Sequence, residues 1–270
     1  MADAVDAAAL YARLSIARIR EQLQYRTSFA LQTLGMFVIS FLDFAAILVL
    51  FANVPQLGGW SVSEVALLYA LSSLAFSLTD LVIGHLDLLP QMVRAGTFDL
   101  ILVRPRGTLF QLVTQDFQLR RVGKIAQSIA ILAYALATVR VDWTLERAAL
   151  LVVIVPAGAL IFGSIWVAAI CIVFWTIDAN EAANAVTYGG SFFAQYPINI
   201  YDRWLRRFLA YVVPTAFVAY FPALFILGKP DPLGLPAWLE VSTPLVALMA
   251  AAVTALIWRA AVRHYQSAGG

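Results

Sequence analysis

Charged side chains are scarce in this sequence. Of its 270 residues, 13% are Asp, Glu, Lys or Arg, whereas 62% are hydrophobic. A water-soluble domain carries about 25% charged residues, so this composition excludes an ordinary soluble domain and predicts an integral membrane protein. No polar stretch is long enough to fold as a separate soluble domain, and we therefore expect one all-α membrane domain.

Cysteine, histidine and lysine are also scarce. Cys171 is the only cysteine, which excludes an intrachain disulfide and a cluster of thiolate metal ligands. The two histidines, His85 and His264, are too few for a metal site of their own. Neither Lys124 nor Lys229 belongs to a GxxxxGK[ST] phosphate loop, and the HExxH and GxSxG patterns of hydrolases are missing. We expect no catalytic residue, cofactor or metal on this chain, which is therefore not an enzyme.

Long hydrophobic runs are what the sequence does contain. Crossing a bilayer takes about 20 apolar residues. Six stretches are predicted to cross: about 28–52, 62–85, 122–140, 148–175, 182–200 and 241–258. Ser61 and Glu64 form the pattern of a capping box, which predicts the start of the second span.

Residues 1–27 precede the first span. Their start, MADAVDAAAL, is acidic and lacks an apolar core, so we do not expect a cleaved signal peptide. Residues 4–26 carry apolar side chains at helical spacing, with Arg13, Arg18, Arg20 and Arg26 among them. This pattern predicts an amphipathic helix lying on the membrane surface, with its arginines near anionic headgroups. A helix packed on a partner subunit is the alternative.

Basic residues predict the orientation of the spans. The N-terminal segment holds four arginines, and the connection 86–124 is the most basic in the chain, whereas the loop 53–61 has no basic residue. Loops rich in Lys and Arg stay in the cytoplasm, so the N-terminus and residues 86–124 are predicted to be cytoplasmic.

The apolar segment 203–227 complicates the count of crossings. If it also crossed, seven crossings would place Arg259 and Arg263 outside, against the charge rule. Pro214 and Pro222 are expected to break this segment into two short helices. We therefore predict a re-entrant hairpin on the outer side, six spans and two cytoplasmic termini. This topology places three arginines on the outer side, which is an exception to the charge rule: Arg203, Arg206 and Arg207.

Residues 86–106 form a distinct cytoplasmic segment. Gly96 is typical of a helix end, Thr97 is predicted to cap a short new helix with Asp99 in its first turn, and Arg104-Pro105 ends it. A short helix on the basic side of a membrane protein can be moved by a partner. The alternative is an interfacial helix that rests on lipid headgroups.

Two carboxylates belong to predicted spans. Asp43 lies well inside the first, and Asp80 lies near the cytoplasmic end of the second. Ionisable residues inside a membrane are functional candidates by default. Asp43 is either a hydrogen-bonding group between helices or an ion or proton site, and the second interpretation gives the rival class, a secondary transporter or channel.

The pattern Arg94, Gly96, Phe98-Asp99 and Leu102-x-Arg104-Pro105 resembles the cytoplasmic segment of the ABC-2 type export permeases. The similarity extends along nearly the whole chain. It includes REQLQYRTSF, LGGWSVSEVALLYA, YPINIYDRWLRRFLAYVVPTAFVAYFPALFILG and the ending RHYQSAGG.

This resemblance implies a bacterial inner-membrane exporter of amphipathic substrates such as drugs, antibiotics, lipids or glycolipids. Two permeases, identical or sisters, would pair with two ABC ATPase subunits that hold ATP and Mg, surrounded by membrane lipid and without nucleic acid. Residues 4–23 would be a gate helix. Residues 202–227 would close the exit, with Arg203, Pro214 and Pro222. Residues 91–103 would be the coupling helix, in which we expect Phe98 to anchor in a groove of the ATPase; the coupling residues are Arg94, Gly96, Phe98, Asp99, Leu102, Arg104 and Pro105.

Overall fold

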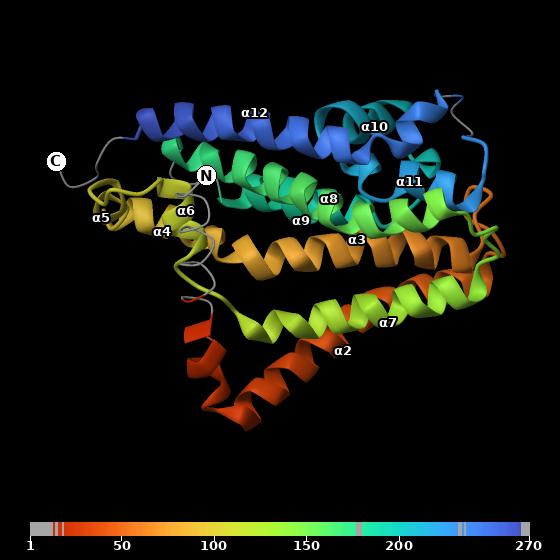
Figure 1. Ribbon diagram of the computed structural model, residues 1–270, viewed down its shortest axis with the longest axis horizontal. Helices are drawn as coiled ribbons and strands as arrows, with labels where there is room; N and C mark the ends of the chain where they lie inside the picture. The colour runs from red at the N-terminus through yellow and green to blue at the C-terminus, as the bar shows by residue number, and fades with distance from the viewer. Residues whose placement is uncertain are drawn as a thin grey trace.

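The computed structural model describes residues 13, 16–17, 19–176, 180–231, 234 and 236–265. Across these ranges every regular element is a helix, and long helices lie side by side along the longest axis (Figure 1). The all-α prediction is thus confirmed. The longer helices are α2 (Arg26–Asn53), α3 (Val62–Ile83), α7 (Val122–Thr138), α8 (Leu145–Ile170), α9 (Asn180–Phe193) and α12 (Thr243–Arg263); the shorter ones are α4 (Leu89–Arg94), α5 (Asp99–Leu102), α6 (Thr108–Val113), α10 (Arg203–Arg207) and α11 (Tyr220–Leu227).

Within the described residues, four helical segments are long and apolar enough to cross a membrane. They match the first, second, fourth and sixth predicted spans, and they are Arg26–Asn53, Val62–Arg94, Leu145–Phe174 and Thr243–Arg263. The third and fifth predicted spans form shorter helices, because α7 has 17 residues and α9 has 14. The prediction of helix up to residue 200 is wrong for the fifth span, since α9 ends at Phe193, four residues before Pro197, which cannot donate a backbone hydrogen bond.

Helix α3 is the centre of the bundle and is mostly buried against α7 and α8. A helix buried on all sides is hydrophobic all round, which is why its sequence lacks a polar face. Hydroxyl groups join it to its neighbours. The Ser73 and Ser128 hydroxyls lie 2.7 Å apart between α3 and α7, and Thr79 Oγ1 donates to the Ala159 carbonyl of α8 at 2.8 Å.

The segment 203–227 is bent by 76° between Arg203–Val212 and Thr215–Leu227. Pro214 lies at the bend, as predicted. Pro222 does not break a helix, and that prediction is wrong: it lies in the first turn of α11, where the backbone nitrogens have no intrahelical acceptor to lose.

The short helices gather at the two ends of the bundle (Figure 1). Helices α4, α5 and α6 lie at one end, and α10 and α11 lie toward the other. We call these the α4–α6 end and the α10–α11 end. Most of the predicted amphipathic helix at 4–26 lies outside the described residues; residues 19–23 are helical, and a turn at 24–25 leads into α2.

Candidate functional site

The segment between α3 and α6 is the candidate site, because it concentrates the predicted coupling residues. Helix α4 ends at Arg94, and Gly96 follows with φ +67°, a left-handed conformation that glycine adopts at low cost. The predicted helix stop is confirmed. Asp99 lies in the first turn of α5, as predicted, but Thr97 does not cap that helix: its hydroxyl donates to the Met92 carbonyl at 3.2 Å.

The side chain of Phe98 is buried within the chain, with 0% of its surface exposed. Its ring centre lies 5.3 Å from that of Phe174, after α8, and 4.9 Å from that of Tyr265, after α12. The expectation that Phe98 inserts into a groove of a partner is therefore wrong for this structure. Helices α8 and α12 converge at this end and supply the apolar cover that an aromatic side chain needs.

The outward face of α5 is apolar instead. Leu100 is 61% exposed and Val103 is 80% exposed, with Leu102 beside them. Exposed neighbours around them are Arg94, Arg104, Pro105 and Arg106. We call Leu100, Leu102 and Val103 the apolar tip. An apolar patch rimmed by polar groups is typical of a protein or membrane contact.

Helix α6 holds α5 and the residues after it through hydrogen bonds. The Gln111 side chain donates to the Ile101 carbonyl at 3.0 Å and to the Arg106 carbonyl at 2.7 Å. Trp258 of α12 donates its indole N–H to the Thr108 hydroxyl at 3.1 Å. Hydrogen bonds from α6 thus hold the turn that carries the apolar tip, and α6 is itself hydrogen-bonded to α12.

Two carboxylates connect the same end to the remaining helices. Asp80, buried at the end of α3, forms ion pairs with Arg121 and Lys124 near the start of α7, each at 3.0 Å. Asp87 accepts hydrogen bonds from Trp166 of α8 at 2.8 Å and from Tyr188 of α9 at 2.9 Å.

From the sequence, Asp80 is expected near this end but without a known partner, and no sequence pattern points to Asp87. The partners of Asp80 lie 41 and 44 residues away, and those of Asp87 lie 79 and 101 residues away. No local pattern reports pairs at such separations. A buried carboxylate does need a partner, which is the one signal that could have directed attention to Asp80.

Gln22 joins the N-terminal segment to this region. Its side chain accepts a hydrogen bond from the Leu119 amide at 2.8 Å and donates one to the Phe117 carbonyl. A cavity of about 300 Å³ lies nearby, between the start of α4 and the connection to α7, and its lining includes His85, Gln91, Met92 and Asp116.

Asp43 interacts electrostatically with one of these groups, the Lys124 ammonium group that pairs with Asp80. Asp43 is exposed on α2 and makes no hydrogen bond or ion pair with another residue of the described ranges. Lys124 is thus shared by the two predicted intramembrane carboxylates, as an ion-pair partner of Asp80 and through charge interaction with Asp43.

The α10–α11 end carries its own cluster. The Lys229 ammonium group lies 2.9 Å from the Glu64 carboxylate and 4.8 Å from the centre of the Trp60 ring. Glu64 also accepts from the Ser61 amide at 2.7 Å, which is one half of the predicted capping box. The end of α11 is thus held against the start of α3, whereas Arg203 stays exposed.

Comparison with protein families identifies the chain. The profile of the ABC-2 family transporter protein matches residues 37–269. The chain belongs to the ABC-2 transporter family. The match includes the predicted coupling residues, the apolar tip and the bent segment. No curated protein and no solved structure matches the chain.

Membership makes this ABC-2 protein a permease, the membrane transport subunit of an ABC transporter and not itself the ATPase. It implies association with an ABC ATPase subunit. Within the part of the permease that the structure describes, no group of three or more His, Cys, Asp or Glu side chains could hold a metal ion.

Proposed function

We propose that this permease belongs to an ATP-driven exporter that moves an amphipathic substrate out of the cytoplasm or the inner leaflet. The apolar tip is the surface that contacts the ATPase. The observation that carries this proposal is that α5 and its flanking residues have one exposed and one buried side. Leu100 and Val103 are exposed, whereas Phe98 and Ile101 are buried in the permease. An apolar centre with a rim of arginines has the composition of a protein interface.

Movement of the tip would reach the membrane helices through the packed contacts behind it. Phe98 transmits it to the ends of α8 and α12, and Asp87 transmits it to α8 and α9. The Asp80 ion pairs add α7. Packed cores move as bodies rather than deforming continuously, so a push at α5 becomes a displacement of helices.

In the proposed topology the α4–α6 end faces the cytoplasm of a bacterial cell and α7 and α9 cross the inner membrane as short spans. A helix of 17 residues is about 25 Å long. Arg140, just beyond its end, can reach the outer interface by extending its side chain, whereas Lys124 at its start pairs with Asp80. The bent segment re-enters from outside and both termini are cytoplasmic. Residues 4–23, within the N-terminal segment 1–27, act as the gate helix. A second permease, identical or a sister, completes the pathway beside two ATPases that hold ATP and Mg.

The test is co-purification of the ATPase with a permease that carries Leu100→Ala and Val103→Ala together. Truncating two apolar anchors at an interface costs about 2 kcal/mol or more, so retention of the ATPase should fall by roughly thirtyfold. The matched control is Leu145→Ala, which truncates a side chain that is 87% exposed at the opposite end of the bundle. Wild-type retention in the double variant would refute the apolar tip as the ATPase contact.

A secondary transporter or channel is the second candidate, favoured by one observation. Asp43 is an exposed carboxylate on a helix long enough to span a membrane, and it makes no hydrogen bond or ion pair with another described residue. Such a group is a candidate ion or proton site. Uptake or efflux driven by a pH gradient without any ATPase, and lost in Asp43→Asn, would establish this candidate and refute the exporter.

A further inference from the structure

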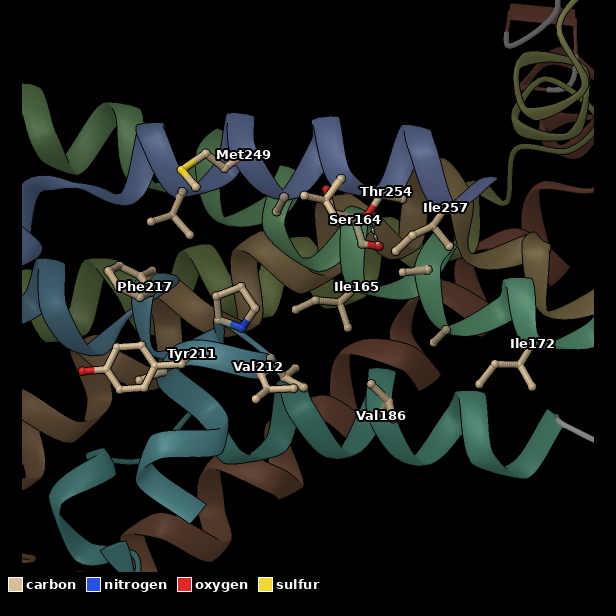
Figure 2. A pocket seen from close by; sticks show the side chains of 18 residues that line it. Ser164, Ile165, Ile172, Val186, Tyr211, Val212, Phe217, Met249, Thr254 and Ile257 are labelled. Atoms are coloured by element: carbon tan, nitrogen blue, oxygen red, sulfur yellow. Dashed lines mark hydrogen bonds between the residues drawn. The ribbon is translucent and has the colours of Figure 1, made fainter. Parts of the chain in front are cut away.

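An apolar groove of about 440 Å³ lies between α8, α9, α12 and the bent segment. Figure 2 shows Ile165 of α8 between α12 on one side and Val186 of α9 on the other. The Ser164 and Thr254 hydroxyls donate to helix carbonyls, at 2.7 and 3.0 Å, so neither needs a ligand. The groove therefore suits an apolar occupant.

Tyr211 marks one end of the groove, and its hydroxyl points away from the other lining side chains (Figure 2). Helix α10 runs directly into this lining through the π-helix Phe208–Val212. Arg203 and Arg207 are four residues apart in α10 and so share one side of it, with about 6 Å of rise between them. Tyr211 follows four residues later, in the π-helix. All three side chains are exposed.

Arg203 and Arg207 carry charges that no described residue neutralises through an ion pair. Neither makes an ion pair or a side-chain hydrogen bond with another residue in the described part of the chain. Aromatic side chains surround them, since Trp204 is 69% exposed and Phe208 and Tyr211 are also exposed. Exposed Trp and Tyr are typical of the level of lipid headgroups, so we expect the two arginines to lie at the level of lipid phosphates.

We propose that the groove and the two arginines together bind one anionic phospholipid from the surrounding membrane. An acyl chain lies in the groove, and the phosphate accepts hydrogen bonds from Arg203 and Arg207, which match phosphate geometry well. The Tyr211 hydroxyl is placed to donate to the same headgroup. A lipid joins an apolar chain and an anion in one molecule, whereas an apolar partner helix would cover the arginines without neutralising them.

This site also accounts for an exception in the charge pattern. The arginines of α10 lie at the opposite end of the bundle from the basic segment 86–124, on the side that the orientation rule leaves poor in basic residues. A bound anion offsets the charge there. The inference does not depend on the transported substrate or on the ATPase.

The experiment measures lipid retained by the purified full-length permease. The protein is incubated in detergent with phosphatidylglycerol or with phosphatidylcholine of the same acyl chains, and bound lipid is counted by native mass spectrometry. We expect phosphatidylglycerol to be retained about tenfold more strongly, because each arginine near a headgroup favours an anionic lipid severalfold. Arg203→Gln with Arg207→Gln should reduce its retention to that of phosphatidylcholine.

Matched variants separate the two parts of the site. Ala250→Trp fills the groove from α12 and should abolish retention of both lipids, whereas Ala252→Trp, exposed on the same helix outside the groove, should not. Arg140→Gln removes an exposed arginine at the end of α7 and should leave retention unchanged. Equal retention of the two lipids by the wild type would overturn the proposal. So would an Ala250→Trp variant that keeps phosphatidylglycerol but loses pairing between permeases, because the groove would then be a subunit interface.

Discussion

At the scale of single residues, the sequence shows that a position matters but not which way its side chain points. Phe98 belongs to the pattern that resembles ABC-2 permeases, and its aromatic side chain is an attractive anchor for a partner. In the structure it is the side chain that holds the α4–α5 turn against Phe174 and Tyr265. The neighbouring residues Leu100 and Val103 take the outward position.

This reversal gives a prediction for Phe98. Phe98→Ala should lower the free energy of unfolding by about 3–5 kcal/mol, as for other buried aromatic side chains, and Phe98→Leu should lower it much less because an apolar side chain still fills the site. Thermal unfolding of the purified permease measures both. Folded Phe98→Leu should retain the ATPase as the wild type does. Unchanged stability of Phe98→Ala together with loss of the ATPase would instead make Phe98 the anchor.

At the scale of elements, the two prolines of the bent segment have different roles. Pro214 lies at the 76° bend and separates the π-helix from the turn that precedes α11. Pro222 lies in the first turn of α11, where proline costs little. The sequence makes the two look alike, because it does not show where α11 begins.

Export should therefore respond to one proline and not to the other. Pro214→Ala removes the restraint that keeps the two helices apart, and we expect reduced export with normal insertion into the membrane. Pro222→Ala should leave export near that of the wild type. Export of a labelled substrate from cells, normalised to permease in the membrane, measures both; equal effects of the two variants would contradict distinct roles.

At the scale of the whole molecule, the arrangement separates two ends with different contacts. The α4–α6 end carries the apolar tip and the contacts of Asp80 and Asp87 with three other helices. The α10–α11 end carries the Lys229–Glu64 ion pair and the exposed arginines of α10. An exporter needs its ATPase at one end and its exit at the other, and this separation is consistent with the proposed orientation.

Labelling of single cysteines tests that orientation. In a Cys171→Ser background, Gln56→Cys and Ala237→Cys should react in intact cells with a thiol reagent that cannot cross the membrane. Gly107→Cys and His264→Cys should react only after the cells are opened. All four positions are exposed, so accessibility depends on the side of the membrane. Labelling of His264→Cys from outside would place the end of α12 outside and refute the re-entrant hairpin.

The sequence by itself determined the class of protein, the position of most helices and the family. Hydrophobic runs and turn residues act locally: a run of apolar residues forms a helix in a membrane wherever it occurs, and Gly96 ends a helix because of its own backbone freedom. Only the tertiary structure decided that Phe98 faces inward, that Asp80 pairs with α7 and that Asp87 joins α8 to α9. Those contacts join residues far apart in the chain, and the direction in which a side chain points depends on which helices pack beside it.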